Sequence, residues 1–241
     1  AAAAAEVIQR VNPDVLALNE IDNNFQQGKM TEVSNARAFV DNYLKEPQKE
    51  GLSGVDYEYI YVAKSNTGVP SGMDIDNNGE VVTEAGTRAY GNDAYGYGEY
   101  RGQYAMALLS KYPIAEDKVR TFRKFLWKDM PDNKMPIGEE HGGMYLTEEE
   151  AEKFRLSSKS HWDVPINIDG TTVHVLMAHP TPPVFDGAAN LNGRRNHDEV
   201  RLLTDYVKGK GYIYDDSGEQ GGLPEDAKAV LMGDMNASPG G

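Results

Sequence analysis

The sequence predicts an α/β sandwich, and three observations support this fold class. Apolar segments with strand character mix with helical segments along the chain, two strands flank a hairpin turn, and polar residues follow the ends of several strands. Such a mixture is typical of layered folds in which helices cover the faces of sheets. The chain has 241 residues, long enough to bury a substantial core, and we expect a single domain over residues 1–241.

The N-terminal part of the chain alternates between helix and strand. Alanine-rich sequence favours a helix over residues 2–11, and the apolar run DVLAL predicts a buried strand at residues 14–18. Apolar residues with helical spacing predict a helix over residues 31–45, with Thr31 as its N-cap. The aromatic run YEYIYVA then predicts a strand at residues 57–63.

Two segments with little periodicity interrupt the middle of the chain. Residues 64–100 are rich in Gly, Asn, Asp and Tyr, and their aromatic content predicts an ordered functional loop. Strand character returns at residues 103–110 and again at residues 119–127. A second irregular segment covers residues 128–145, and a short helix capped by its first residue is expected at residues 147–154.

The clearest strand pairing lies in the last third of the chain. Residues 161–168 have strand alternation, an Asp-Gly pair predicts a hairpin turn, and residues 171–178 form the partner strand. We expect an amphipathic helix at residues 196–207 and a last buried strand at residues 229–232.

The composition excludes several kinds of chemistry. Without any Cys, the chain has no thiolate nucleophile, no disulfide and no Cys-ligated zinc. A metal must then be held by oxygen or imidazole, and oxygen ligands favour Mg²⁺, Ca²⁺ or Mn²⁺. The net charge of −14 argues against broad electrostatic binding to nucleic acid or anionic lipid. It does not exclude phosphate chemistry, because a bound cation reverses the local field.

Three predicted strands end in side chains that can carry chemistry: Glu20, His179, and Asp234 with Asn236. A hard metal ion held by Glu20 can bind a phosphate oxygen and neutralise developing charge. Asp234 can orient or deprotonate a water, Asn236 can hydrogen-bond the nucleophile or the phosphate, and His179 can donate a hydrogen bond to phosphoryl oxygens. The alternative is structural, because a Gly-Asp-x-Asn run often forms a turn and a Glu after a strand is often solvated.

Four segments, in this order along the chain, resemble the endonuclease/exonuclease/phosphatase superfamily. The run NPDVLALNE at residues 12–20 resembles its PDV-x-x-LQE segment, and QYAMALLSKYPI at residues 103–114 resembles its G-x-A-x-LS-x-x-PI segment. TVHVLMAHP at residues 172–180 resembles the strand that ends in its site histidine, and LMGDMNASP at residues 231–239 resembles its GD-x-N-x-x-P segment. Each segment alone is a weak signal, but the ordered set covers most of the chain.

This resemblance implies a four-layer α/β sandwich with two packed mixed β-sheets and outer helices. It implies that Glu20 binds Mg²⁺ or Mn²⁺, with Asp234 as a further ligand. By the same resemblance, Asp234 and Asn236 position the nucleophile and phosphate, and His179 contacts the scissile phosphate. The family also has an Asn on an earlier strand, and an Asp and an Asp-His pair on later strands, which this sequence does not contain. We therefore expect the domain to be incomplete at both ends.

Three further stretches are similar to a bacterial, mostly exported subgroup of this superfamily. They are SNTGVPSG at residues 65–72, HPTPPVFDG at residues 179–187 and NGRRNHDE at residues 192–199. The substrates of this subgroup are generally not well defined, so the similarity supports the chemistry better than the substrate. It implies an extracellular or periplasmic location, although no signal peptide is visible in the sequence.

A second metal site is suggested by the run DIDNNG. It matches the first half of a calcium loop, with Asp74, Asp76 and Asn78 as ligands. The acidic residue expected at the twelfth position is replaced by Ala85. The alternative is a solvated turn rich in Asp and Asn.

Other polar and aromatic residues allow a functional and a structural interpretation. Arg194 and Arg195 can form bidentate contacts with phosphate, or they can pair with Asp186, Asp198 or Glu199. His197 is a candidate further ligand. A further group of residues can either line the substrate site or pack inside the protein: His161, Trp162, Tyr90, Tyr95, Tyr97 and Tyr100.

The sequence thus predicts a divalent-metal-dependent phosphoester hydrolase of phosphodiesterase or nuclease type, which uses a metal-aligned water. Its substrate is a nucleic acid, a nucleotide or a small phosphoester. One alternative is an extracellular phosphomonoesterase of the same fold, which a panel of model substrates distinguishes. The other is a non-catalytic binding or structural module in a surface assembly, which a downstream Asp-His pair in the full-length gene would exclude. The metal identity and the oligomeric state are not predicted.

Overall fold

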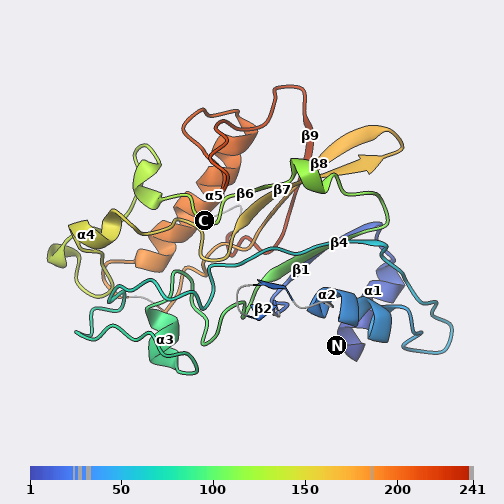
Figure 1. Cartoon of the computed structure of the whole chain (residues 1–241), viewed down its shortest axis with the longest axis horizontal. Helices are drawn as coiled ribbons and strands as arrows, with labels where there is room; N and C mark the ends of the chain where they lie inside the picture. Colours follow the sequence, from blue (N-terminus) through green and yellow to red (C-terminus); the bar gives the residue numbers. More distant parts are fainter. Residues whose placement is uncertain (24, 27–28, 31–33, 186, 239–241) are drawn as a thin grey trace.

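The computed structural model describes residues 1–23, 25–26, 29–30, 34–185 and 187–238. Its elements form four layers, with α1 and α2 on one side, two sheets in the middle and α5 on the other side (Figure 1). The helical elements are α1 (Ala2–Val11), α2 (Asn35–Phe39), the π-helical η1 (Val40–Leu44), α3 (Arg88–Asn92), the 3₁₀ turns η2 (Glu116–Lys118), η3 (Trp127–Asp129) and η4 (Glu139–His141), α4 (Glu148–Ala151) and α5 (Leu191–Val207). The strands are β1 (Val15–Asn19), β2 (Phe25–Gln26), β3 (Lys29–Met30), β4 (Tyr59–Tyr61), β5 (Met106–Ser110), β6 (Arg120–Thr121), β7 (His161–Ile168), β8 (Thr171–Ala178) and β9 (Lys228–Met232).

The first sheet has the strand order β1-β5-β4, and its pairings are antiparallel. Successive side chains of a strand point to opposite faces. Ala107 and Leu109 of β5 therefore face the same side, where they pack with Ala5, Val40 and Leu44 of α1 and η1. The helices of the N-terminal part cover this outer face.

The second sheet has the order β6-β7-β8-β9 and is mixed, because β8 and β9 run parallel. β7 and β8 form the predicted hairpin, and Asp169 and Gly170 at its turn have φ values of 50° and 83°. Positive φ at both positions is what a two-residue type I′ turn requires. Leu176 and Ala178 of β8 belong to the same core cluster as Leu202 of α5, which covers the outer face of this sheet.

The inner faces of the two sheets pack against each other. Met106 and Leu108 of β5 share a buried cluster with Trp162, Val175 and Met177 of the second sheet. The alternation of side chains in β5 and β8 thus supplies both the contact between the sheets and the contacts with the helices. The four-layer sandwich expected from the sequence is confirmed, with an antiparallel first sheet and a mixed second sheet.

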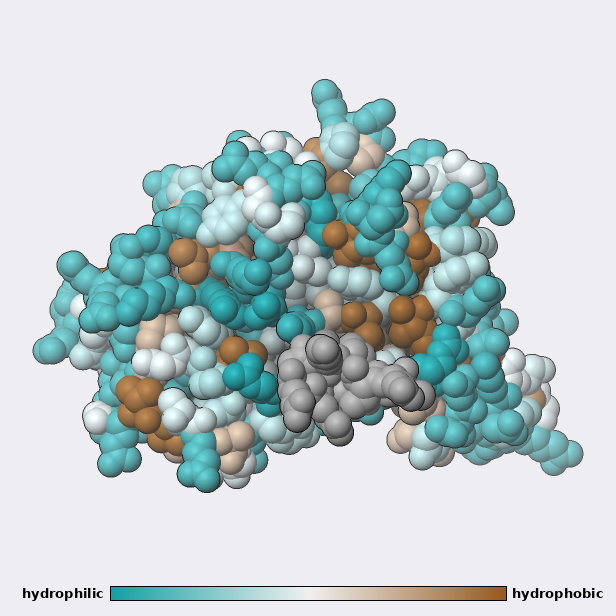
Figure 2. Space-filling model, viewed as in Figure 1, coloured by the Kyte–Doolittle hydropathy of each residue, from teal (hydrophilic) through white to brown (hydrophobic). Residues whose placement is uncertain are grey.

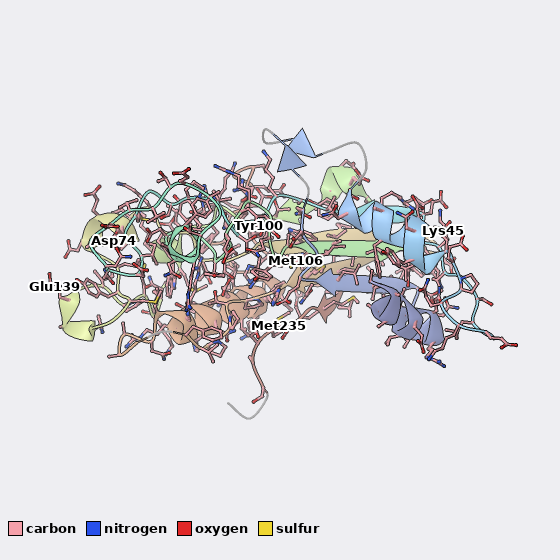
Figure 3. All side chains as sticks on the ribbon, turned by 90° about the horizontal axis from the view of Figure 1, so that it is seen from below. Lys45, Asp74, Tyr100, Met106, Glu139 and Met235 are labelled. Atoms are coloured by element: carbon pink, nitrogen blue, oxygen red, sulfur yellow. The ribbon has the colours of Figure 1, made fainter. Side chains whose placement is uncertain are left out.

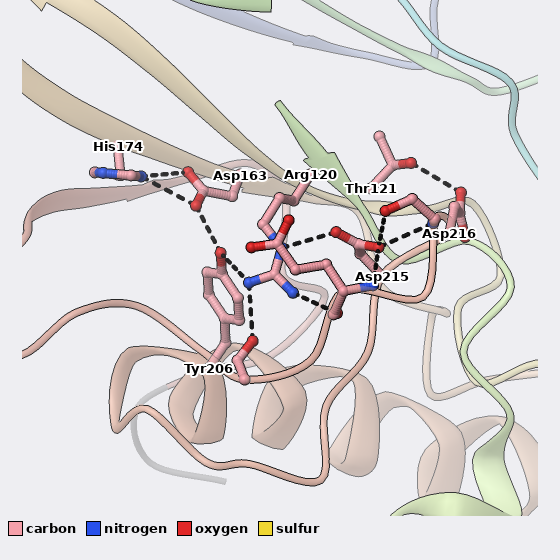
Figure 4. A network of polar contacts seen from close by, with 10 residues as sticks. Arg120, Thr121, Asp163, His174, Tyr206, Asp215 and Asp216 are labelled. Carbon is pink, nitrogen blue, oxygen red and sulfur yellow. Dashed lines mark hydrogen bonds and ion pairs between the residues drawn. The ribbon is translucent and has the colours of Figure 1, made fainter. Parts of the chain in front are cut away.

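A buried polar network ties the second sheet to α5 and to the segment that follows it (Figure 4). Asp163 of β7 accepts a hydrogen bond from the Tyr206 hydroxyl at 2.6 Å and lies 2.8 Å from Nδ1 of His174. Arg120 of β6 pairs with Asp215 at 2.8 Å. Because these polar groups are paired, they join three strands, α5 and the loop after it without leaving charges unsatisfied.

Most predicted elements are confirmed, with boundaries that differ by a few residues. The last strand, β9, is present but is exposed and not buried as expected, because it lies at the edge of the second sheet. The short helix α4 has the predicted cap: the Thr147 hydroxyl accepts from the Glu150 amide, and the Glu150 carboxylate accepts from the Thr147 amide. The helix expected at residues 31–45 is α2 followed by η1. It begins after Ser34, whose hydroxyl accepts from the backbone of Arg37 at 3.1 Å, while Thr31 lies outside the described residues.

Two predicted elements were wrong in extent. The strand expected at residues 119–127 is limited to β6, because Phe122, Phe125 and Trp127 are all buried in one cluster under α5 instead of alternating between two faces. The helix expected at residues 196–207 begins earlier, at Leu191. Its first turns were mistaken for a loop because they are polar.

The face in view in Figure 2 is mostly hydrophilic, with small hydrophobic groups between polar side chains. This surface agrees with the net charge of −14. Among the described helices, none combines the length and the apolar sequence needed to cross a membrane.

The contact between the sheets predicts a large effect of a single truncation. Leu108 is 0% exposed between them. Leu108→Ala is expected to lower the free energy of unfolding by about 2–5 kcal/mol, measured by urea denaturation, because it removes buried methyl groups and leaves a cavity. Val11→Ala, at a residue that is 70% exposed, is the control and should change stability by less than about 0.5 kcal/mol. Equal losses in the two variants would contradict the sandwich packing.

Candidate active site

Glu20, His179 and Asp234 follow the C-terminal ends of β1, β8 and β9. Because β8 and β9 are parallel neighbours, His179 and Asp234 emerge at the same edge of the second sheet. The end of β1 pairs with Met106, which packs in the same inter-sheet cluster as Met177 near the end of β8. The first sheet therefore delivers Glu20 to the same end of the sandwich.

A buried lysine, Lys159, connects these groups electrostatically. The charges of both Glu20 and Asp234 act on Lys159, and the charges of Lys159 and Asp234 act on His179. Asn236 joins the group through its side-chain amide, which donates to the carbonyl of Pro180 at 3.0 Å. The structure thus brings together the four predicted site residues and adds Lys159, which the sequence interpretation missed.

Glu20 has a left-handed backbone, with φ of 57°, which is uncommon and costly for a residue other than Gly. The segment after it is held in place by a neighbouring loop. The two carboxylate oxygens of Asp22 accept hydrogen bonds from the Tyr104 amide at 2.9 Å and the Tyr100 hydroxyl at 2.5 Å. The bond to Asp22 raises the pKa of Tyr100 to about 12. The backbone strain at Glu20 therefore coincides with a segment that is tied down on its C-terminal side.

Asp234 and Asn236 form a local turn at the end of β9. Oδ1 of Asp234 accepts from the Asn236 amide at 2.9 Å, and Asn236 has a left-handed φ of 47°. The structural interpretation of this motif is therefore correct for the backbone. It does not exclude the functional one, because a carboxylate has further lone pairs that can bind a cation.

His179 is a neutral imidazole in this environment. It is 4% exposed, and its Nδ1 atom is buried without a hydrogen-bond partner among the described residues. Burial, followed by the charge of Lys159, lowers the pKa of His179 to about 4. A neutral ring can present one N–H donor to a substrate oxygen at pH 7.

The donor atoms at the strand ends suit a hard divalent cation. Glu20 and Asp234 both supply carboxylate oxygens, and neither forms an ion pair within the described part of the chain. The buried Oδ1 atom of Asn19, directly before Glu20, also has no partner there. Mg²⁺ and Mn²⁺ prefer such oxygen donors, so the residues present fit the expected metal.

The N-terminal half of α5 holds the loops of the site together. Oε1 of Glu199 accepts from the Ser158 amide at 2.7 Å, and Oε2 accepts from the Thr181 amide at 2.6 Å. Asn196 donates to the carbonyls of Thr181 at 2.8 Å and Met235 at 3.0 Å. Three loops, those that carry Lys159, His179 and Asp234, are thereby fixed to one helix.

The two predicted arginines differ in their surroundings. Arg195 is 5% exposed and donates to the carbonyls of Tyr95, Arg155 and Leu156 at 2.6–3.0 Å. The structure gives it a packing role in place of the predicted phosphate contact. Arg194 is half-buried and reaches the carbonyl of Lys134 at 3.4 Å, so its phosphate contact stays a prediction.

Within the described residues, neither arginine forms the alternative ion pair with Asp198 or Glu199. The third proposed partner, Asp186, lies outside the described residues.

His161 and Trp162 are structural in this geometry. Buried His161 lies 2.6 Å from the Ser157 hydroxyl and 3.0 Å from the carbonyl of Glu199. Trp162 packs between the sheets. His197 is exposed, lies 2.9 Å from Asp198 and lines a surface pocket together with Asn236, so its role as a further ligand stays a prediction.

The tyrosines of the Gly-rich loop divide into two kinds. Tyr90 is 2% exposed and donates to the carbonyl of Gly68, and Tyr95 packs on Phe154, so both hold the loop in place. Tyr97 and Tyr100 are about 45% exposed. These two remain available to line a cleft.

Two of the predicted calcium ligands lie together with a third aspartate: ligand atoms of Asp74, Asp76 and Asp93 all lie within 4.8 Å of one another. Oδ1 of Asn78 accepts from the Glu80 amide at 2.8 Å, and its role as a ligand stays a prediction. Figure 3 shows Asp74 toward one end of the molecule, away from Met235 beside the strand-end site.

Comparison of the sequence with models of known protein families identifies one matching family. A model described as the endonuclease/exonuclease/phosphatase family matches residues 1–241. A similar solved structure is an endonuclease/exonuclease/phosphatase family protein from Leptotrichia buccalis C-1013-b, at 13% sequence identity and a TM-score of 0.43. The match covers 97% of this chain and 60% of that one, so the chain spans about 60% of that protein's length. The comparison with curated proteins gives no match.

The contacts of Glu199 predict that it stabilises the site loops. Glu199→Gln replaces a carboxylate oxygen with a side-chain amide NH2 group, a donor that faces the backbone N–H of Ser158 or Thr181, so one buried backbone donor is left unsatisfied. We expect a loss of about 1–3 kcal/mol in the free energy of unfolding and faster amide hydrogen exchange at those two residues. Glu225→Gln, at an exposed loop residue, is the matched control. Unchanged exchange in Glu199→Gln would show that the helix does not hold these loops.

Proposed function

Because the chain belongs to the endonuclease/exonuclease/phosphatase family, whose members generally hydrolyse phosphoester bonds with a divalent metal, we propose that it is a metal-dependent phosphodiesterase. One observation carries the proposal. Glu20 and Asp234, which form no ion pair within the described residues, both act by their charges on Lys159, and Lys159 and Asp234 act on the buried imidazole of His179. Cation-binding oxygens beside an uncharged donor suit the hydrolysis of a phosphoester.

We assign each residue of the site a role according to the chemistry of its side chain. Glu20 and Asp234 would hold Mg²⁺ or Mn²⁺, which when bound stabilises negative charge on the phosphoryl oxygens and aligns a water. Asp234 orients that water or accepts its proton. His179, neutral at pH 7, donates a hydrogen bond to a phosphoryl oxygen without repelling the cation. The Asn236 amide is oriented by its bond to the carbonyl of Pro180 and can hydrogen-bond the nucleophile.

The substrate class follows from the same site only in outline. A nucleic acid, a nucleotide or a small phosphoester all contain the bond that this arrangement would attack. The negative surface disfavours tight nonspecific binding of nucleic acid, so a small or cation-screened substrate is favoured. An extracellular phosphomonoesterase is the nearest alternative, since the same donors can bind a terminal phosphate.

Hydrolysis assays test the proposal directly. We expect the purified protein to hydrolyse bis-p-nitrophenyl phosphate faster than p-nitrophenyl phosphate, with Mg²⁺ or Mn²⁺ and not with EDTA. Plasmid DNA as a third substrate tests nuclease activity. Glu20→Ala should lower kcat/KM at least about 100-fold, because it removes a metal ligand, without loss of folding.

Glu225→Ala is the control, because Glu225 is exposed before the N-terminal end of β9, opposite to Asp234. A faster reaction with the monoester would favour the phosphomonoesterase. No turnover with any metal would favour the non-catalytic binding or structural module.

We also propose that Asp74, Asp76 and Asp93 bind Ca²⁺. Oδ1 of Asp76 is buried and has no partner among the described residues. Burial, and then the charges of Asp76 and Asp74, raises the pKa of Asp93, which a bound cation would reverse. A calcium site of modest affinity would suit the extracellular or periplasmic location that we propose from the sequence resemblance.

Calcium removal tests this second site. Ca²⁺ at about a hundredfold excess over its Kd should stabilise the wild-type protein by about 2.7 kcal/mol in thermal unfolding. Asp76→Asn should abolish this gain while leaving Mg²⁺-dependent hydrolysis unchanged, because the cluster lies away from the strand ends. Asp226→Asn, at an exposed aspartate, should retain the gain. Equal stabilisation of all three proteins would place the calcium elsewhere.

A further inference from the structure

Lys159 is a buried cation without a partner. Its side chain is 7% exposed, and its ammonium group forms no hydrogen bond or ion pair in the part of the chain that the structure describes. Burial lowers the pKa of Lys159, since the charged form loses its hydration. Nζ of Lys159 is not among the fully enclosed unpaired atoms of the described residues, so an anionic ligand can reach it from solvent. A charged group that has lost most of its hydration gains from such a partner.

The backbone around Lys159 is fixed from several sides. Its carbonyl accepts from the Asn66 amide at 2.8 Å, and the Asn66 side chain donates to the carbonyl of Ser157 at 2.7 Å. Ser158 is bound through its amide and hydroxyl to Glu199. Gly96 lies against this segment so closely that a Cβ there would come within 1.8 Å of the Ser158 carbonyl oxygen. The lysine is therefore attached to a preorganised backbone, which lowers the entropic cost of a contact with a ligand.

The charges that act on Lys159 define its environment. Glu199, Glu20 and Asp234 favour its charged form, and Arg195 opposes it. The carboxylate of Glu199 is already used by the amides of Ser158 and Thr181. The other two carboxylates, Glu20 and Asp234, are the expected ligands of the divalent cation.

With a cation on those two carboxylates, the charge of Glu199 would still favour the ammonium form of Lys159, while the charge of Arg195 would oppose it. The site would then contain a divalent cation, an ammonium group and the neutral His179. Such a set lacks one component, an anion with several oxygen acceptors. A phosphoryl group supplies it, and lysine is a common point-charge binder of phosphate.

We propose that Lys159 is a phosphate-binding residue of this site, whose ammonium group donates to a non-bridging phosphoryl oxygen of the substrate beside Glu20, His179 and Asp234. This inference rests on the proposed hydrolase function and adds a residue to it. No covalent step is assigned to Lys159, since it only balances charge on the phosphoryl oxygens.

The test compares Lys159→Met and Lys159→Gln with the wild-type protein. Binding of inorganic phosphate in the presence of Mg²⁺ is measured by calorimetry, alongside kcat and KM for bis-p-nitrophenyl phosphate and thermal unfolding. We expect phosphate binding to weaken at least about 10-fold and kcat/KM to fall about 100-fold in both variants. The melting temperature should stay equal or rise in Lys159→Met, because an unpaired buried charge is removed.

Lys111→Met is the matched control. Lys111 follows the end of β5 that pairs with the start of β1, at the end of the sandwich opposite to Glu20, where its ammonium group bonds Asn12 and Asp14. It should bind phosphate and turn over substrate as the wild type does.

Phosphate binding and kcat/KM within twofold of wild type in both Lys159 variants would overturn the proposal, as would failure of both to fold, which assigns Lys159 to the core. A wild-type protein that binds no phosphate would overturn it as well. If the wild type binds phosphate through Lys159 but hydrolyses nothing, the hydrolase function fails and the anion site remains.

Discussion

The hydrogen bonds of the buried Glu199 carboxylate are the interaction on which the site depends most. One oxygen binds the backbone before Lys159 and the other binds the backbone after His179, so a single side chain sets the spacing of two loops. Asn196, one turn earlier on the same helix, adds the loop that follows Asp234. A buried carboxylate is costly unless its lone pairs are used, and here backbone amides use them. The chemistry at the strand ends therefore depends on a helix that contributes no proposed catalytic side chain.

The sequence predicted the sandwich well where local signals and tertiary packing agree. The β7–β8 hairpin combines alternation with an Asp-Gly turn, and both its strands were predicted to the residue. The start of α5 was missed because Arg195 looks solvent-exposed in the sequence but is buried, with carbonyls as its partners. Periodicity detects apolar burial and has no signal for polar burial, so a helix that packs through hydrogen bonds is read as a loop.

The residues of the site likewise include some that the sequence predicted and one that it did not. Glu20, His179 and Asp234 could be found because strand ends gather at one edge of a sandwich. Lys159 was missed, although the hairpin register pairs His161 with Ala178 and so brings residues just before β7 beside His179. The proximity of Asp93 to Asp74 and Asp76 had no such signal, because Asp93 lies at the end of α3, well after the DIDNNG run in the sequence.

The positions along α5 of the residues that bind the site loops constrain the length of this helix. Arg195, Asn196 and Glu199 reach their partners because each lies at a set angle around the helix axis, and one residue corresponds to about 100° of rotation. A single insertion or deletion between them would turn one contact away from its loop while keeping the other. Length variation among related proteins is thus expected to accumulate in the surface loops, such as the one between α5 and β9. The helix itself should keep its residue count even where its solvent-facing side chains change.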